Sequence, residues 1–94
     1  METRVAVISI IVESPDSVAA VNEILHLYSA YIIGRMGIPY RQKNISIISI
    51  AIDAPQDVTA ALSGKIGRLP GVSAKTAYSG HKAGADPNDE KKQS

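Results

Sequence analysis

Three features of this 94-residue sequence predict an α+β fold, in which a four-stranded antiparallel sheet carries two helices on one face. The first is an internal repeat, because Val5–Ala20 aligns without a gap on Ile45–Ala60. The second is that each copy is an apolar run followed by an acid and a proline, as expected where a strand leads into a helix. The third is that further apolar runs, Tyr31–Ile38 and Val72–Tyr78, follow the two helix-like stretches.

The first repeat predicts a buried strand and an amphipathic helix. Val5–Val12 is β-branched and nearly all apolar, which is typical of a buried strand. Ser14, Pro15 and Asp16 suit a helix start, since serine can cap, proline fits the first position and an acid favours the positive end of the helix dipole. The apolar stripe that follows consists of Val18, Val21, Leu25 and Tyr28, widened by Ile24 and Leu27.

The middle of the chain predicts a hairpin. Tyr31–Ile38 is the expected second strand, in which Gly34 and Gly37 indicate a bulge or the close approach of another chain. Pro39–Asn44 has the composition of a turn, and Ile45–Ile52 is the expected third strand.

The second repeat predicts the second helix and the last strand. Asp53–Pro55 begins the helix, and its inner stripe is expected at Val58, Leu62, Ile66 and Leu69, with Ala61 between them. The segment Leu69–Gly71 ends it, because proline cannot continue a helix and glycine tolerates the turn. The resulting βαββαβ order is the ferredoxin-like arrangement. We expect its first and third strands to lie side by side and parallel in the middle of the sheet.

Composition limits the class of protein. We expect one folded domain over residues 1–79 and a disordered tail over residues 80–94, which are polar and glycine-rich. The net charge of +1 gives no general attraction to nucleic acid or to an anionic membrane. The absence of cysteine excludes disulfides and thiolate metal sites and fits a cytoplasmic protein. No signal peptide is visible, no apolar run approaches the roughly 20 residues that a spanning helix needs, and no cofactor is expected.

The strands are apolar on both faces, which predicts self-association. In the third strand Ile45 and Ile47 point one way, whereas Ile48 points the other. The helices can cover only one face, and soluble monomers rarely leave a large apolar patch in water. We therefore expect Val5, Val7, Ile45 and Ile47 to lie in the interface of a dimer or tetramer. The alternative is that the tail or the hairpin covers this face.

Polar residues at one sheet edge form a candidate ligand site. Glu13 and Asp53 end the two strands that we expect to be parallel, so they should lie close together. Ser14, Asp16 and Gln56 should lie at the same edge, where open sheets tend to bind ligands. The site suits a cation or a small polar effector. The alternative is that the acids only complement the helix dipoles.

The hairpin forms a second candidate site, because it is basic and carries one aromatic ring. Arg35, Tyr40, Arg41 and Lys43 suit an anion or single-stranded nucleic acid, and the alternative is a solvated hairpin or contacts to a neighbouring subunit. His26 fits the end of the first helix, where the dipole favours it, and one histidine is not a metal site. No nucleophile–base pair and no phosphate-binding glycine loop is visible, so we predict a protein that is not an enzyme.

The stretches Tyr31–Arg41 (YIIGRMGIPYR) and Leu62–Ser79 (LSGKIGRLPGVSAKTAYS) resemble the small proteins called putative iron-only hydrogenase system regulators. The resemblance covers about residues 3–79 and implies an ACT-like regulatory domain that oligomerises. At greater distance the pattern is similar to the C-terminal domain of the nickel-responsive repressor, which is tetrameric. Gly37 and Pro39 stand where that domain carries its His-x-His pair, so its nickel site is not expected here.

We therefore expect a non-enzymatic, oligomeric regulator linked to iron-only hydrogenase maturation, which binds a small effector or a partner protein at a subunit interface. The loop Glu13–Asp16 lacks the glycine of amino-acid-binding ACT domains, so an amino-acid effector is not implied. The alternative is a structural or adaptor protein that docks a partner through its sheet face. A third reading is direct DNA binding in transcription regulation. The near-neutral charge argues against it, as does a first strand that begins almost at Met1, which leaves no room for a DNA-binding arm.

Overall fold

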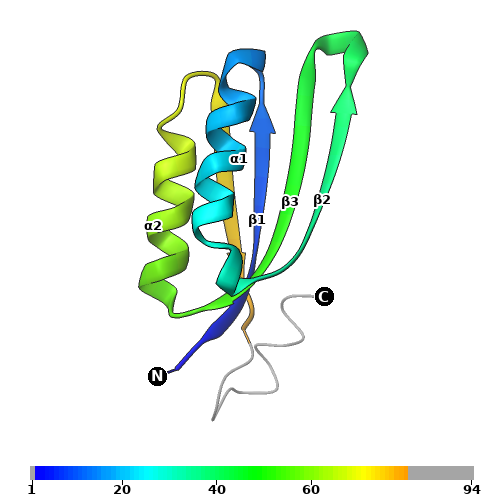
Figure 1. The fold of residues 1–94 in the computed structure, drawn as a ribbon. Helices are drawn as coiled ribbons and strands as arrows, with labels where there is room; N and C mark the ends of the chain where they lie inside the picture. The colour runs from blue at the N-terminus through cyan, green and yellow to red at the C-terminus, as the bar shows by residue number, and fades with distance from the viewer. Residues whose placement is uncertain (1, 81–94) are drawn as a thin grey trace.

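The computed structural model describes residues 2–80, which form a four-stranded sheet with two helices packed on one face (Figure 1). The elements are β1 (Arg4–Val12), η1 (Pro15–Ser17), α1 (Val18–Leu27), η2 (Ser29–Tyr31), β2 (Ile32–Tyr40), η3 (Arg41–Lys43), β3 (Ile45–Ala54), α2 (Gln56–Gly67) and β4 (Val72–Tyr78). The predicted α+β, ferredoxin-like arrangement is confirmed. Residues 81–94, which make up nearly all of the predicted tail, lie outside the described residues.

The sheet has the strand order β2-β3-β1-β4, and every neighbouring pair is antiparallel. The prediction that β1 and β3 are parallel was therefore wrong. The helix α1 carries the chain back across the sheet, so β1 and β2 run in the same direction. The strand β3 follows β2 through a hairpin and is inserted between β2 and β1, so it runs opposite to both.

The core lies between the sheet and the two helices. It is built from alternate residues of the central strands together with two residues of each helix: Ala6, Ile8, Ile10, Val12, Ile48, Ile50, Ile52, Val21, Leu25, Leu62 and Ile66. Two predicted core positions are wrong, because Leu27 and Ala61 are exposed. Leu27 lies two residues beyond Leu25, which turns its side chain about 200° around the helix axis. Thr59 is buried on the inner side of α2 as well, together with Leu62 and Ile66.

The junction between β1 and α1 is fixed by the turn that precedes β4. The side chain of Ser14 makes no cap hydrogen bond, contrary to the prediction, and a single 3-10 turn precedes α1. The Glu13 N–H donates instead to the Gly71 carbonyl over 2.7 Å, and the Ser17 hydroxyl donates to the Pro70 carbonyl over 2.7 Å. Gly71 has a φ of +68°, which glycine adopts without strain.

The β2–β3 hairpin projects beyond the helix layer (Figure 1). A register shift between Ile32 and Gly34 confirms the bulge predicted at Gly34, whereas Gly37 pairs regularly with Ile48. The strand β2 continues to Tyr40, past the predicted end. The 3-10 turn η3 and a left-handed residue, Asn44 with φ +57°, then reverse the chain.

Candidate functional site

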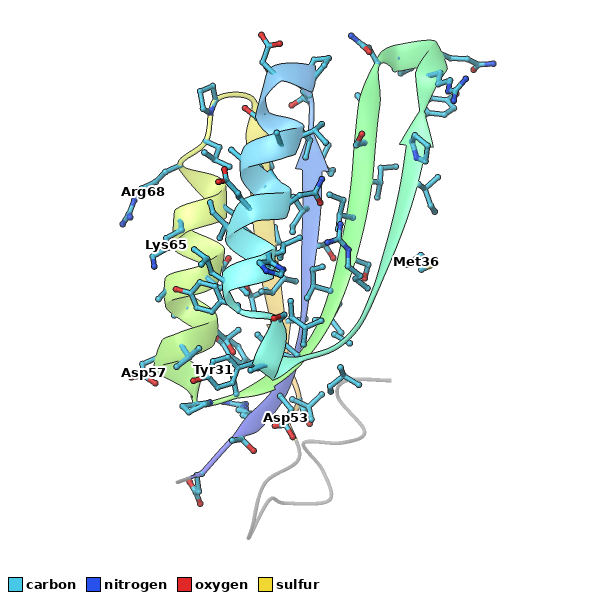
Figure 2. All side chains as sticks on the ribbon, viewed as in Figure 1. Tyr31, Met36, Asp53, Asp57, Lys65 and Arg68 are labelled. Atoms are coloured by element: carbon cyan, nitrogen blue, oxygen red, sulfur yellow. The ribbon has the colours of Figure 1, made fainter. Side chains whose placement is uncertain are left out.

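The predicted joint site of Glu13 and Asp53 does not form. Asp53 pairs with Val5 at one end of β1, whereas Glu13 follows Val12 at the other end. At about 3.3 Å per residue, the two acids are separated by roughly 26 Å along the strand. Figure 2 shows Asp53 at the end of the sheet near which α2 begins. The two acids are separated because β3 is antiparallel to β1, so that Asp53 lies at the end of the sheet opposite Glu13.

Gln56 lies at the Asp53 end and is engaged by β1. Its Oε1 accepts a hydrogen bond from Nη1 of Arg4 over 3.3 Å. The same arginine donates from Nε to the carbonyl of Ser79 over 2.8 Å. Its guanidinium carbon lies 5.1 Å from the ring centroid of Tyr78. These contacts of Arg4 connect β1 with α2 and with the end of β4, so the Gln56 side chain takes part in packing between these elements.

The other members of the predicted edge site lie at the opposite end. Ser14 packs against Gly71, since a Cβ built on Gly71 would come within 2.7 Å of the Ser14 Cβ. Glu13 and Asp16 are exposed beside it. The basic tip of the hairpin, η3, lies at this same end, because Val12 pairs with Ser46. The structure thus brings the acidic loop to the end of the sheet that carries the basic tip, which the sequence analysis did not foresee.

The predicted basic cluster of the hairpin is also divided. Arg41 and Lys43 lie in the tip, where the Tyr40 hydroxyl donates to Oε1 of Gln42 over 2.9 Å. Arg35 lies six residues before Arg41, roughly 20 Å away along an extended chain. It lies on the helix side of β2, where Nη2 donates to Oδ1 of Asn22 on α1 over 2.8 Å.

A groove runs between α1 and the β2–β3 hairpin on the helix side of the sheet. It consists of three adjoining hollows of about 310, 240 and 100 Å³. Asn22 and Arg35 line the first two hollows, and Val18, Pro39 and Ser46 line the second and third. The lining includes Arg35, Arg41 and His26 but no aspartate or glutamate. The groove exists because two helices cannot cover four strands, which leaves β2 open.

Sequence reasoning missed Asn22, which holds Arg35. The signal is present in the helix period, because Val18, Asn22 and His26 are spaced by four residues and form one column of α1. This column borders the buried stripe that contains Val21 and Leu25. The polar residues of this column, Asn22 and His26, lie beside the buried stripe, which indicates a helix flank that faces a partly open space.

The second sheet face, which the helices leave uncovered, is apolar as predicted. Val5, Val7 and Ile47 are exposed on it, and Ile45 is half-buried. The pairings Met36–Ser49, Ile38–Ile47 and Tyr40–Ile45 place three more exposed β2 side chains on this face. Figure 2 shows Met36 projecting from β2 on the side away from the helices. We call this surface the open face. Its role as a subunit interface stays a prediction.

Within residues 2–80, no three histidine, aspartate or glutamate side chains are grouped so that they could hold a metal ion. In the same part of the chain, no helix has the length and apolar character needed to cross a membrane.

Comparisons with known proteins agree with this geometry. Residues 4–76 match the family model described as "TM1266-like: Iron-only hydrogenase system regulator, putative". The structure of the uncharacterized protein TM1266 from Thermotoga maritima is similar with 37% identity and a TM-score of 0.79, covering 82% of this chain and 98% of that chain.

A more distant similarity supports the fold alone. A formyltetrahydrofolate deformylase from Pseudomonas putida KT2440 matches with 14% identity and a TM-score of 0.60, over 83% of this chain and 30% of that one. Among curated proteins, none matches.

Proposed function

Because the chain belongs to the TM1266-like family of iron-only hydrogenase system regulators, we propose that it is a non-enzymatic regulatory module that works as a homo-oligomer. In this proposal two copies pack through their open faces, and a small effector or a partner protein shifts the balance between assembled and free states. The non-enzymatic part of the proposal rests on the family description as a regulator.

The observation that carries the proposal is the apolar character of the open face. Seven large apolar side chains on this face, each between 40% and 61% exposed, are Val5, Val7, Ile11, Met36, Ile38, Tyr40 and Ile47. They lie on the three adjacent strands β2, β3 and β1, and Ile38, Ile47 and Ile11 follow one another directly across these strands. Ser9 and Ser49, which pair in the middle of this face, are small and uncharged. Such a patch is typical of a surface that another protein covers.

The free energy available from covering this patch is large enough for a dimer. Fully burying one Val, Ile or Met side chain contributes about 1.5–3 kcal/mol, so covering seven half-exposed side chains on each of two copies contributes on the order of 10–20 kcal/mol. The loss of translational and rotational freedom on association costs about 4–15 kcal/mol. A second copy is the natural occupant, because an isologous interface needs only one self-complementary surface.

The test is the mass of the full chain by light scattering coupled to size exclusion at micromolar concentration. We expect at least twice the monomer mass of 9.9 kDa. Ile11→Lys places a charge beside Ile47 on the open face and should give a monomer. Leu27→Lys introduces the same charge at an exposed position of α1 and should leave the mass unchanged.

Two results would overturn the proposal, provided that circular dichroism shows all variants folded. One is a monomeric wild type, which would favour an adaptor whose open face is covered by a different protein. The other is an equal decrease of the measured mass in both variants, which would show that an added lysine disrupts assembly wherever it is placed. Direct DNA binding is not proposed, since the net charge of +1 supplies little attraction to phosphates.

A further inference from the structure

The groove between α1 and the hairpin has a charge that nothing in the described fold neutralises. The guanidinium of Arg35 makes one hydrogen bond, to Asn22, and no carboxylate within residues 2–80 pairs with it. A guanidinium offers five N–H donors in a planar fork that matches carboxylate and phosphate oxygens. Since Asn22 occupies one donor nitrogen and orients the group, the remaining donors are available to an anion in the groove.

The floor of the groove is kept open by a glycine. Gly37 lies on the helix side of β2, because it pairs with Ile48, whose side chain is buried beneath the helices. A Cβ built on Gly37 would meet nothing within 4 Å, and its φ is not positive. Neither the backbone nor the packing therefore requires glycine, although glycine weakens a strand. What the glycine provides is free space beside Arg35.

The walls of the same space are largely apolar. Leu25 and Ile32 line the hollow on one side of Arg35, and Ile48 and Pro39 line the hollow on the other. The two hollows measure about 310 and 240 Å³ and adjoin at Arg35, so as one continuous site they exceed the lower limit of about 300 Å³ for small-molecule sites. An apolar cleft with one oriented cation favours a ligand with a ring-sized apolar body and one anionic head.

We infer that this groove binds a small organic oxyanion, a carboxylate or a phosphate monoester, whose head pairs with Arg35 and whose body lies over Gly37. The inference deepens the proposed function by naming the chemical class of its effector. A failure of this inference can be told apart from a failure of the proposed function, because the inference is tested by ligand binding, whereas assembly through the open face is tested by mass.

The experiment is an NMR titration of the ¹⁵N-labelled full chain at constant ionic strength. Benzoate and phenyl phosphate are the probes, and benzamide is the neutral control with the same ring. We expect saturable shifts of the Asn22, Arg35 and Gly37 amide signals with at least one oxyanion, and binding of benzamide at least about tenfold weaker. The stronger of the two oxyanions identifies the head group.

Variants then separate the role of charge from the role of space. Arg35→Gln should weaken oxyanion binding at least about tenfold, because charge-assisted hydrogen bonds are lost. Arg68→Gln is the matched control, since Arg68 lies at the end of α2 and points away from the hairpin (Figure 2). Gly37→Val should fill the floor of the groove and weaken the binding of both oxyanions and of benzamide, while the chain remains folded.

Three results would overturn the inference. The first is no saturable shift with either oxyanion. The second is equal affinity for benzoate and benzamide. The third is an equal effect of Arg35→Gln and Arg68→Gln, which would indicate nonspecific attraction to a cationic surface.

Discussion

Replacing Gly71 by alanine should destabilise the domain strongly, because two independent costs arise at that position. The residue has a φ of +68°, and the left-handed region costs a non-glycine residue about 1–2 kcal/mol. The new Cβ would also lie 2.7 Å from the Ser14 Cβ and 3.1 Å from the Ser14 backbone nitrogen. Relieving that contact moves the turn away from β1 and weakens the Glu13 N–H bond to Gly71, which contributes about 0.5–1.5 kcal/mol.

These costs give an expected loss of about 2–4 kcal/mol, or a fall in Tm of about 10–25 °C for a domain of this size. The matched control is Gly64→Ala in α2, where nothing lies within 4 Å of the added Cβ. It should raise stability by about 0.8–1 kcal/mol, the difference in helix propensity. The assay is urea and thermal unfolding at one protein concentration, since assembly makes Tm concentration-dependent. A Gly71→Ala variant within about 0.5 kcal/mol of wild type, or a destabilised Gly64→Ala variant, would refute the reasoning.

Three further substitutions should change stability in defined directions in the same assay. Thr59→Val should stabilise the fold by about 1 kcal/mol, because the buried Thr59 hydroxyl has no hydrogen-bond partner within residues 2–80; a loss of stability would show that the hydroxyl is satisfied. Ser17→Ala should cost about 1–2 kcal/mol, since it leaves the Pro70 carbonyl without its 2.7 Å donor; an unchanged midpoint would contradict this role. Gly37→Val should stabilise the fold by about 0.5–1 kcal/mol, as a β-branched residue replaces glycine in a strand with open space above it; destabilisation would mean that the space is not free.

The fold could be predicted because it depends on patterns that neighbouring residues carry. Val5–Val12 and the third strand are short apolar runs rich in β-branched residues, which marks them as strands, and the buried Val21 and Leu25 lie on the predicted stripe of α1. The direction of a strand does not depend on such local patterns, since no residue of β3 encodes whether the strand is parallel or antiparallel to β1. It follows from the connections: a helix crossover and then a hairpin. Working through those connections would have given the antiparallel β1–β3 pair.

The candidate sites were harder to predict, because they depend on pairs of residues far apart in the sequence. The prediction placed Glu13 and Asp53 close together because it gave β3 the wrong direction, whereas the register places them at opposite ends of β1. Ser14 fits an N-cap by residue type, yet the geometry of the turn is set by Gly71 and Pro70, more than fifty residues away. The role of Asn22 as the hydrogen-bond partner of Arg35 depends on the packing of α1 beside β2, which the residue types alone do not give.

The strand β2 links the two proposed activities, because its alternate residues belong to different surfaces. Met36 lies on the open face, whereas its neighbours Arg35 and Gly37 line the groove. A ligand that changes the twist of β2 from the groove therefore acts directly on the shape of the assembly surface. If oxyanion binding and assembly are coupled, linkage requires that each changes the affinity of the other by the same factor.

This coupling can be measured with one variant. Benzoate or phenyl phosphate, whichever binds better, should have a different affinity for the wild type than for the monomeric Ile11→Lys variant, because Ile11 does not line the groove that contains Arg35. In a dilution series at saturating oxyanion, the dissociation constant of a dimer should then change by the square of that factor, because each of the two copies carries one groove. Equal oxyanion affinities in the two proteins would mean that the groove and the open face work independently, so that the groove ligand is not the regulator of assembly.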